Sequence, residues 1–204
     1  MEKKDMWQIE NSHFMQGITC ICGVDEAGRG PLAGPVCAAA VILPAGLHIP
    51  GLDDSKKLTD KRRRELFPII KEQAIAYGIA FATHEEIDEI NILQATYLAM
   101  ERAISGLSVR PALALIDGNR AKDFGLPVQT VVKGDSLSAN IAAASILAKV
   151  TRDDYMEEIA KTYPQYGFEI HKGYGTRLHY EKLAQFGPSP IHRMTFLKKL
   201  YGTK

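Results

Sequence analysis

Residues 18–30 read ITCICGVDEAGRG and join an apolar run to two adjacent acids and a glycine-rich turn. The apolar residues 18–24 predict a buried strand that ends in front of Asp25 and Glu26. Adjacent carboxylates are unfavourable to bury unless a cation neutralises them. A strand that delivers two acids into the Gly-Arg-Gly turn at 28–30 therefore indicates a metal site beside a bound phosphate group.

The rest of the chain supplies further strands and helices around this segment. Strands are predicted at residues 36–43, 76–82, 112–116 and 128–132, and helices at 58–74, 87–104 and 137–161. Thr59 is expected to cap the first helix and Pro68 to kink or split it. Early strands that follow one another, then strands that alternate with helices, favour an α/β fold with a mixed sheet and helices packed on it.

Composition and charge indicate one folded domain with a basic C-terminal end. The chain has 204 residues, 46% hydrophobic residues and a net charge of +1. Residues 161–204 carry eight Lys or Arg against two acids, and they are punctuated by Gly and Pro, so only two short surface helices are expected there, at 176–186 and 194–201. We expect a single domain over 1–204, with a core at 18–160 and a basic helical segment at 161–204 that suits a polyanionic substrate.

Several protein classes are excluded by simple features of the sequence. The three cysteines form neither a disulfide framework nor a Cys-x-x-Cys zinc pair. Residues 1–10 are charged and lack the apolar core of a signal peptide. Residues 31–45 are apolar but too short to span a bilayer. We therefore expect a cytoplasmic protein without a membrane anchor.

Four acids, Asp25, Glu26, Asp117 and Asp135, lie at or just beyond the ends of predicted strands. Strand ends form the crevice in which open α/β sheets bind ligands, so these acids are expected to converge. Carboxylate oxygens suit Mg²⁺ or Mn²⁺. Two such ions about 3.5–4 Å apart can stabilise both the attacking and the leaving oxygen of a phosphodiester.

Less specific interpretations of the same acids stay open at this point. Asp117-Gly118 is a good turn dipeptide, and Asp135 could simply cap a helix. Asp25 and Glu26 are consecutive, and consecutive strand residues point to opposite faces unless the strand ends there. A phosphate-binding P-loop at residues 23–30 fails in detail, because Arg occupies its lysine position and Gly its Ser/Thr position.

At this stage the residues resemble a known family, the bacterial type 2 ribonucleases H named ribonuclease HII. The resemblance covers about residues 18–196 in order and at compatible spacing. It is carried by GVDEAGRGPLAGP at 23–35, DSKKL at 54–58, NILQAT at 91–96, DGN at 117–119, KGD at 133–135, AAASILAKVTRD at 142–153, HKGYGT at 171–176 and PIHR at 190–193.

The resemblance implies a ribonuclease H-like fold, in which helices flank a mixed central sheet and a C-terminal helical appendage follows. It implies metal-dependent endonucleolytic hydrolysis, with Mn²⁺ or Mg²⁺, of RNA in RNA/DNA hybrids. It also implies incision on the 5′ side of single ribonucleotides embedded in duplex DNA, leaving 3′-hydroxyl and 5′-phosphate ends. Asp25, Glu26, Asp117 and Asp135 match the four catalytic and metal-binding carboxylates of that family.

The resemblance also carries over a set of substrate-binding residues. The backbone of Gly28, Arg29 and Gly30 would read the ribose 2′-hydroxyl, and Tyr174 would stack on the neighbouring deoxyribose at the RNA-to-DNA junction. The remaining candidates are expected to contact phosphates or to support that pocket: Lys56, Lys57, Ser145, Lys149, His192 and Arg193. Asp153, four residues after Lys149, is expected to pair with it.

Two alternatives remain. One is a non-catalytic protein that binds RNA/DNA hybrids, in which the acids are only turn residues. The other is a type 3 ribonuclease H, a subfamily that usually carries an N-terminal substrate-binding domain, whereas here only about seventeen residues precede the first predicted strand. Members of the resembling family are expected to act as monomers, and residues 197–204 contain no clear motif for a replication clamp.

Overall fold

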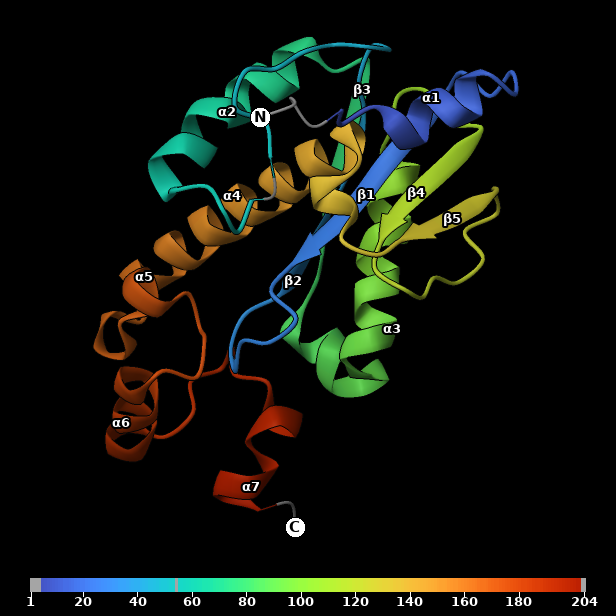
Figure 1. The fold of residues 1–204 in the computed structure, drawn as a ribbon. Helices are drawn as coiled ribbons and strands as arrows, with labels where there is room; N and C mark the ends of the chain where they lie inside the picture. Colours follow the sequence, from blue (N-terminus) through green and yellow to red (C-terminus); the bar gives the residue numbers. More distant parts are fainter. Residues whose placement is uncertain (1–4, 54, 203–204) are drawn as a thin grey trace.

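The computed structural model describes residues 5–53 and 55–202, so Asp54 of the DSKKL block lies outside the described residues. Its centre is a five-stranded sheet in the order β3-β2-β1-β4-β5 (Figure 1). The strands are β1 (Ile21–Ala27), β2 (Val36–Ile42), β3 (Ala76–Ala82), β4 (Leu113–Asp117) and β5 (Val128–Val131). β1 pairs antiparallel with β2 and parallel with β4. The mixed sheet predicted from the sequence is therefore confirmed.

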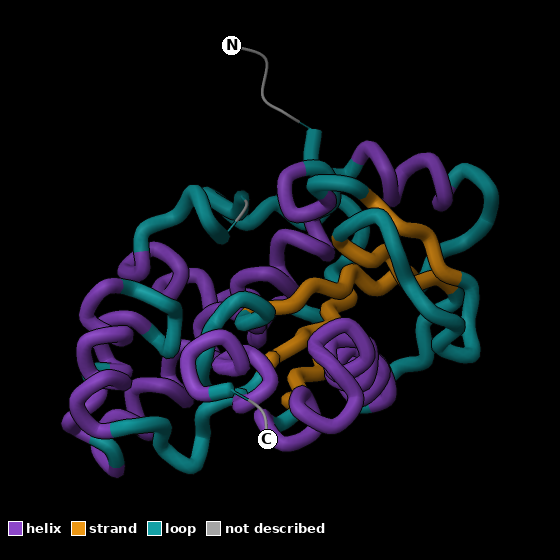
Figure 2. Tube along the Cα trace, turned by 90° about the horizontal axis from the view of Figure 1, so that it is seen from below, coloured by secondary structure: helices purple, strands orange, loops and turns teal. Residues whose placement is uncertain are grey.

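Helices cover both faces of this sheet (Figure 2). On one face α3 (His84–Ser105) packs on β2 and β3, and on the other α4 (Ala139–Thr162) packs on β1 and β2, with α2 (Asp60–Gln73) beside it. Every residue of β2 is buried. Its alternate side chains, such as Ala38 and Ala39, enter separate apolar clusters on the two faces. A strand buried on both sides must be apolar throughout, which explains the unbroken hydrophobic run there.

A glycine in β1 sets how closely α4 approaches the sheet. A Cβ atom at Gly23 would lie 2.2 Å from the backbone carbon of Asn140, at the start of α4. Only glycine permits that approach without displacing the helix. Ser138 caps the helix by accepting a hydrogen bond from the Ile141 N–H. The first turn of α4 is thereby held directly against β1.

The N-terminal helix α1 (Gln8–Phe14) was not predicted from the sequence. Its Glu10 is fully buried and accepts hydrogen bonds from the Ser138 hydroxyl and from the backbone and side-chain N–H groups of Asn140. These contacts are made with residues about 130 positions away, so no local sequence pattern predicts them. Residues 8–14 thus anchor the start of α4.

Three local expectations can be compared with the structure. Thr59 caps α2, as predicted. The prediction that β1 ends before Asp25 is wrong, because pairing with β2 continues to Ala27. The prediction that Pro68 splits its helix is also wrong. α2 runs through it, since proline removes one backbone donor but leaves the other helix bonds possible.

The C-terminal segment forms short helical pieces at one end of the molecule, drawn in orange to red in Figure 1. They are η2 (Pro164–Tyr166), α5 (Phe168–His171), α6 (Arg177–Phe186), η3 (Met194–Leu197) and α7 (Lys198–Tyr201). The two predicted surface helices correspond to α6 and to η3 with α7. No helix within residues 5–53 and 55–202 has the length and apolar character needed to cross a membrane.

This segment encloses three histidines whose rings lie close together. His171 and His179 have ring centroids 4.3 Å apart, and the Nε2 atoms of His179 and His192 are 2.9 Å apart. His179 Nδ1 lies 3.0 Å from the Tyr174 carbonyl, so the cluster fixes the loop that carries Tyr174. Burial lowers the pKa of both His179 and His192 to about 4.

We predict that the stabilising contribution of His179 is lost on acidification. The unfolded chain binds the His179 proton near pH 6.5, whereas the folded chain binds it only near pH 4, so stability falls as the pH drops through that window. Urea unfolding should show that the advantage of wild type over His179→Gln is smaller at about pH 5 than at about pH 7.5. His48→Gln, at an exposed position, is the control. An advantage independent of pH would contradict the prediction.

Candidate active site

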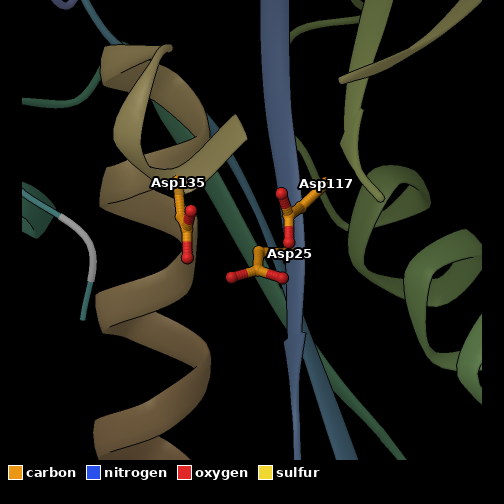
Figure 3. Close-up of side chains that lie close together, drawn as sticks. All are labelled: Asp25, Asp117 and Asp135. Carbon is orange, nitrogen blue, oxygen red and sulfur yellow. The ribbon is translucent and has the colours of Figure 1, made fainter. Parts of the chain in front are cut away.

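Three aspartates from different segments converge at one edge of the sheet (Figure 3). Asp25, Asp117 and Asp135 each offer a carboxylate oxygen, and these oxygens all lie within 4.8 Å of one another. Asp25 is in β1, Asp117 is the last residue of β4, and Asp135 lies in a short 3₁₀ helix (Gly134–Ser136) just before α4. The convergence expected from strand ends is thus observed for these three residues.

The strand register explains why Asp25 and Asp117 are neighbours. Val24 pairs with Ile116 in the parallel β1–β4 ladder, so the two aspartates occupy the next position on adjacent strands. Residues in register on adjacent strands face the same side of a sheet. Both carboxylates therefore project toward the α4 side.

A tight turn after β5 brings the third carboxylate to this pair. Lys133 adopts the left-handed conformation, with a φ of 57°, and the Gly134 N–H donates to Asp117 Oδ1 over 2.7 Å. A Cβ at Gly134 would lie 2.6 Å from Ile141 Cδ1 in α4. Glycine thus lets the turn pack against α4 without displacing that side chain, while its N–H orients Asp117 and Asp135 follows directly.

Glu26 takes a different place from the one expected for a fourth member of the same cluster. Because β1 continues to Ala27, Glu26 points to the face opposite that of Asp25. Its Oε1 lies 3.4 Å from Arg29 Nη1. It also lines a neighbouring hollow of about 310 Å³ on the α3 side, together with Asp117 and Tyr97. Glu26 thus borders the aspartate cluster from across the sheet.

The folded structure disfavours the charged forms of Asp25 and Glu26. Burial raises the pKa of Asp25 well above its usual value, and repulsion from Glu26 and Asp117 raises it further. Burial also raises the pKa of Glu26, although Arg29 opposes that shift. A divalent cation would neutralise this repulsion, and a set of carboxylate oxygens without His or Cys fits Mg²⁺ or Mn²⁺. The donor set therefore fits the ions expected from the sequence.

A cleft of about 240 Å³ opens above the carboxylates. Its lining joins residues that are far apart in the sequence, and all but Ala27 and Ser55 are candidates predicted from the sequence. The lining residues are Asp25, Glu26, Ala27, Gly28, Arg29, Gly30, Ser55, Lys56, Asp117, Ser145, Lys149 and Tyr174. Ser55 was missed, since a single serine beside two lysines carries no distinctive pattern. The cleft thus places a polar, partly basic wall next to the acidic cluster.

The basic residues of the wall lie close to acids. Lys56 Nζ is 3.5 Å from Asp135 Oδ2 while its side chain remains 78% exposed. Lys149 Nζ is 2.7 Å from Asp153 Oδ1, which confirms the predicted pair, and lies 6.0 Å from the centre of the Tyr174 ring. The Ser145 hydroxyl lines the same cleft and is buried without a hydrogen-bond partner among the described residues.

Three predicted phosphate contacts do not line this cleft. Lys57 pairs with Asp53 over 3.2 Å at the surface. His192 is 1% exposed and lies within 2.8 Å of the Ser189 backbone nitrogen, and Arg193 is 0% exposed beneath the Gly28–Gly30 turn. In this structure His192 and Arg193 therefore cannot contact substrate phosphate directly, as was expected. Both side chains are buried and form hydrogen bonds with other parts of the protein.

Comparisons with known proteins agree on one family. The sequence model of the family described as Ribonuclease HII matches residues 22–199. A Ribonuclease HII from Desulfitobacterium hafniense is 55% identical over 195 residues, which cover 96% of this chain and 72% of the relative.

Solved structures agree with this assignment. The crystal structure of the ribonuclease H2 from Pyrococcus horikoshii OT3 has a TM-score of 0.71 and 30% identity, and the match covers 86% of this chain and 92% of that one. The ribonuclease HII in a complex with PCNA from Archaeoglobus fulgidus has a TM-score of 0.69 and 25% identity, covering 88% of this chain and 94% of that one. The ribonuclease H-like fold expected from the sequence is therefore confirmed.

We predict that Asp25→Asn weakens divalent-cation binding without unfolding the protein. The substitution removes one anionic oxygen ligand, and it also removes a buried charge that the folded state disfavours. Calorimetric titration with Mn²⁺ should show an affinity at least about tenfold lower, roughly 1.4 kcal/mol. The metal-free melting temperature should be unchanged or higher.

The matched control for this experiment is Glu158→Gln, which makes the same carboxylate-to-amide change at a surface site where the side chain is 72% exposed. It should bind Mn²⁺ as wild type does. Equal Mn²⁺ affinity for Asp25→Asn and wild type would show that the cluster does not bind the ion through Asp25.

Proposed function

The chain belongs to the ribonuclease HII family of metal-dependent endonucleases, and we propose that it incises duplex DNA on the 5′ side of single embedded ribonucleotides as well as the RNA strand of RNA/DNA hybrids. The cleavage would leave 3′-hydroxyl and 5′-phosphate ends and would begin ribonucleotide excision repair in the cytoplasm. The observation that supports this proposal most directly is the carboxylate cluster beneath a cleft that also contains the Gly-Arg-Gly turn.

In this proposal the four carboxylates together coordinate two ions. Asp25 and Asp117, adjacent on paired strands, would share ions, while Asp135 and Glu26 approach the pair from opposite faces of the sheet. Divalent ions supply a water activated for attack and stabilise the leaving oxygen. The protein's own contribution is to hold acids that repel one another in one place, which the rigid β1, β4 and α4 make possible.

Selection of ribose is assigned to the turn at residues 28–30. Among the described residues the N–H groups of Arg29 and Gly30 have no protein acceptor, so they are available to a ligand hydroxyl. Gly30 does not have a positive φ, and a Cβ there would meet only Tyr174 Cε1, at 3.7 Å. The fold itself therefore does not require glycine at this position, whereas close approach of a sugar to the backbone would.

The remaining proposed contacts position the duplex. Tyr174, 40% exposed beside Gly30, would stack on the neighbouring deoxyribose. Lys56, Lys149 and the unpartnered Ser145 hydroxyl would contact phosphates, with Lys57 and the basic segment 161–204 extending this surface. Phosphate contacts carry no sequence information, so affinity should fall steeply with salt. We propose that the chain acts as a monomer through this single cleft.

The function is tested with end-labelled duplexes that carry one ribonucleotide or a long RNA/DNA hybrid. With Mg²⁺ or Mn²⁺ the protein should cut the first substrate on the 5′ side of the ribonucleotide, and EDTA should stop the reaction. Asp25→Asn should lower kcat by about three orders of magnitude or more, since a metal ligand stabilises the transition state by several kcal/mol. Binding without metal-dependent cleavage would favour the non-catalytic alternative, and cleavage of the long hybrid alone would favour a type 3 activity.

Gly30→Ala is predicted to separate substrate recognition from folding. The new methyl group would project into the space assigned to the ribose, so cleavage at a single ribonucleotide should fall by about tenfold or more, or 1.4 kcal/mol. The free energy of unfolding should be unchanged or about 0.4–1 kcal/mol higher, because alanine restricts the unfolded chain. Urea unfolding and initial cleavage rates measure both quantities. If Gly30→Ala cleaves at the wild-type rate, the ribose does not bind at this position.

A further inference from the structure

Two buried arginines without an acidic partner lie beneath the Gly28–Gly30 turn. Arg152 and Arg193 are both 0% exposed. Neither forms an ion pair with a carboxylate of residues 5–53 or 55–202. Burial lowers the pKa of Arg193 to about 9, and the nearby charge of Arg152 contributes to this. Burying two like charges without counter-ions is unfavourable unless every N–H finds an acceptor.

The acceptors are backbone carbonyls of one segment. Arg193 donates to the carbonyls of Gly28 (2.7 Å), Arg29 (3.0 Å), Pro31 (2.8 Å) and Gly34 (2.8 Å). Arg152 donates to those of Ala33 (3.3 Å), Pro35 (3.0 Å) and Lys172 (3.1 Å). Six of the eight carbonyls in residues 28–35 are thus oriented by one of two guanidinium groups.

The Arg193 side chain does more than join the C-terminal segment to the core. That joining is already made by the backbone: the Arg193 N–H donates to the Leu32 carbonyl over 2.8 Å, and the Gly34 N–H donates to the Ile191 carbonyl over 2.9 Å. The guanidinium extends beyond these bonds to the carbonyls on both sides of Gly30. A planar fork with fixed donor directions can orient several carbonyls at once, which the single ammonium of lysine cannot.

We propose that Arg193 is a positioning residue for ribose selection, because its guanidinium holds the carbonyls of Gly28, Arg29 and Pro31 inward and so leaves the N–H groups of the turn facing the cleft. The inference rests on the proposed function, since it assumes that the turn reads a 2′-hydroxyl. Arg152 supports the opposite wall: it bonds the Lys172 carbonyl, and its Cζ lies 5.8 Å from the centre of the Tyr174 ring.

The test compares affinities for two duplexes of the same sequence, one with a single ribonucleotide and one entirely of DNA. The parent protein is Asp25→Asn, which prevents cleavage, and the variant adds Arg193→Lys, which keeps the charge but loses the fork. We expect the preference for the ribonucleotide duplex to fall at least about tenfold while affinity for the DNA duplex changes less than about twofold. Mn²⁺ affinity of Arg193→Lys, in the protein that retains Asp25, should stay within about twofold of wild type.

Arg102→Lys in the same parent is the control. It also loses a guanidinium fork that bonds a backbone carbonyl, that of Phe81 over 2.9 Å, but Arg102 does not line the cleft. Its ribonucleotide preference should stay within about twofold of the parent. An equal loss of preference in both variants, or an equal loss of affinity for both duplexes in Arg193→Lys, would overturn the assignment and leave Arg193 as a purely structural residue.

A milder variant covers the case in which Arg193→Lys does not fold. Phe196 packs against the guanidinium, with Arg193 Cζ 5.2 Å from the ring centre, and it does not line the cleft. Phe196→Leu should lower the preference by a few-fold, and an unchanged preference would overturn the proposal. A parent protein without any preference would instead overturn the proposed function and this inference with it, so the two failures are distinguishable.

Discussion

The site depends on the close contact between α4 and β1 at Gly23. A side chain there would collide with the Asn140 backbone, so every larger residue would push α4 away from the sheet. Asp135 lies in the short 3₁₀ helix three residues before Ser138, the residue that caps α4, while β1 carries Asp25 two residues after Gly23. The separation between these carboxylates is therefore set by how closely the helix approaches the strand. The β1–β4 register then adds Asp117 beside Asp25 without any further adjustment.

The sequence predicts most of the architecture because its strands are short, apolar and bounded by turn residues. β3 is predicted to the residue, and the three aspartates are correctly expected at one edge of the sheet. The position of Glu26 depends on pairing with β2, which continues past the last apolar residue and which no local pattern encodes. The interior position of Arg193 depends on carbonyls 159 or more residues earlier in the chain. A basic residue in a basic segment looks like a substrate contact until those acceptors are known.

Charges of both signs are buried around the aspartate cluster and the Gly28–Gly30 turn. Burial of either sign without a counter-ion destabilises the folded state. Asp25 is repelled by Glu26 and Asp117, and Arg152 and Arg193 repel each other on the other side of the turn. The two groups do not neutralise each other, because the guanidinium donors are occupied by carbonyls rather than by carboxylates. The carboxylates are therefore not neutralised by these arginines, while the carbonyls of the turn are held by hydrogen bonds. Local stability is lower than an apolar interior would provide, and the proposed function explains why such groups are kept there.

Asp25 and the Gly28–Gly30 turn belong to one continuous segment of the chain. This bears on where the nucleic-acid backbone would be cut. The turn begins at Gly28, three residues after Asp25, and an extended chain of that length spans at most about 11 Å. In the proposed complex Asp25 would hold the metal end of the cleft and Gly28–Gly30 the sugar end, so their separation could not vary independently of β1. A ribose bound by the turn would fix which phosphate lies over the carboxylates. In the proposed reaction, the choice of sugar and the position of the cut would then be one geometric property of residues 25–30, maintained from below by Arg193.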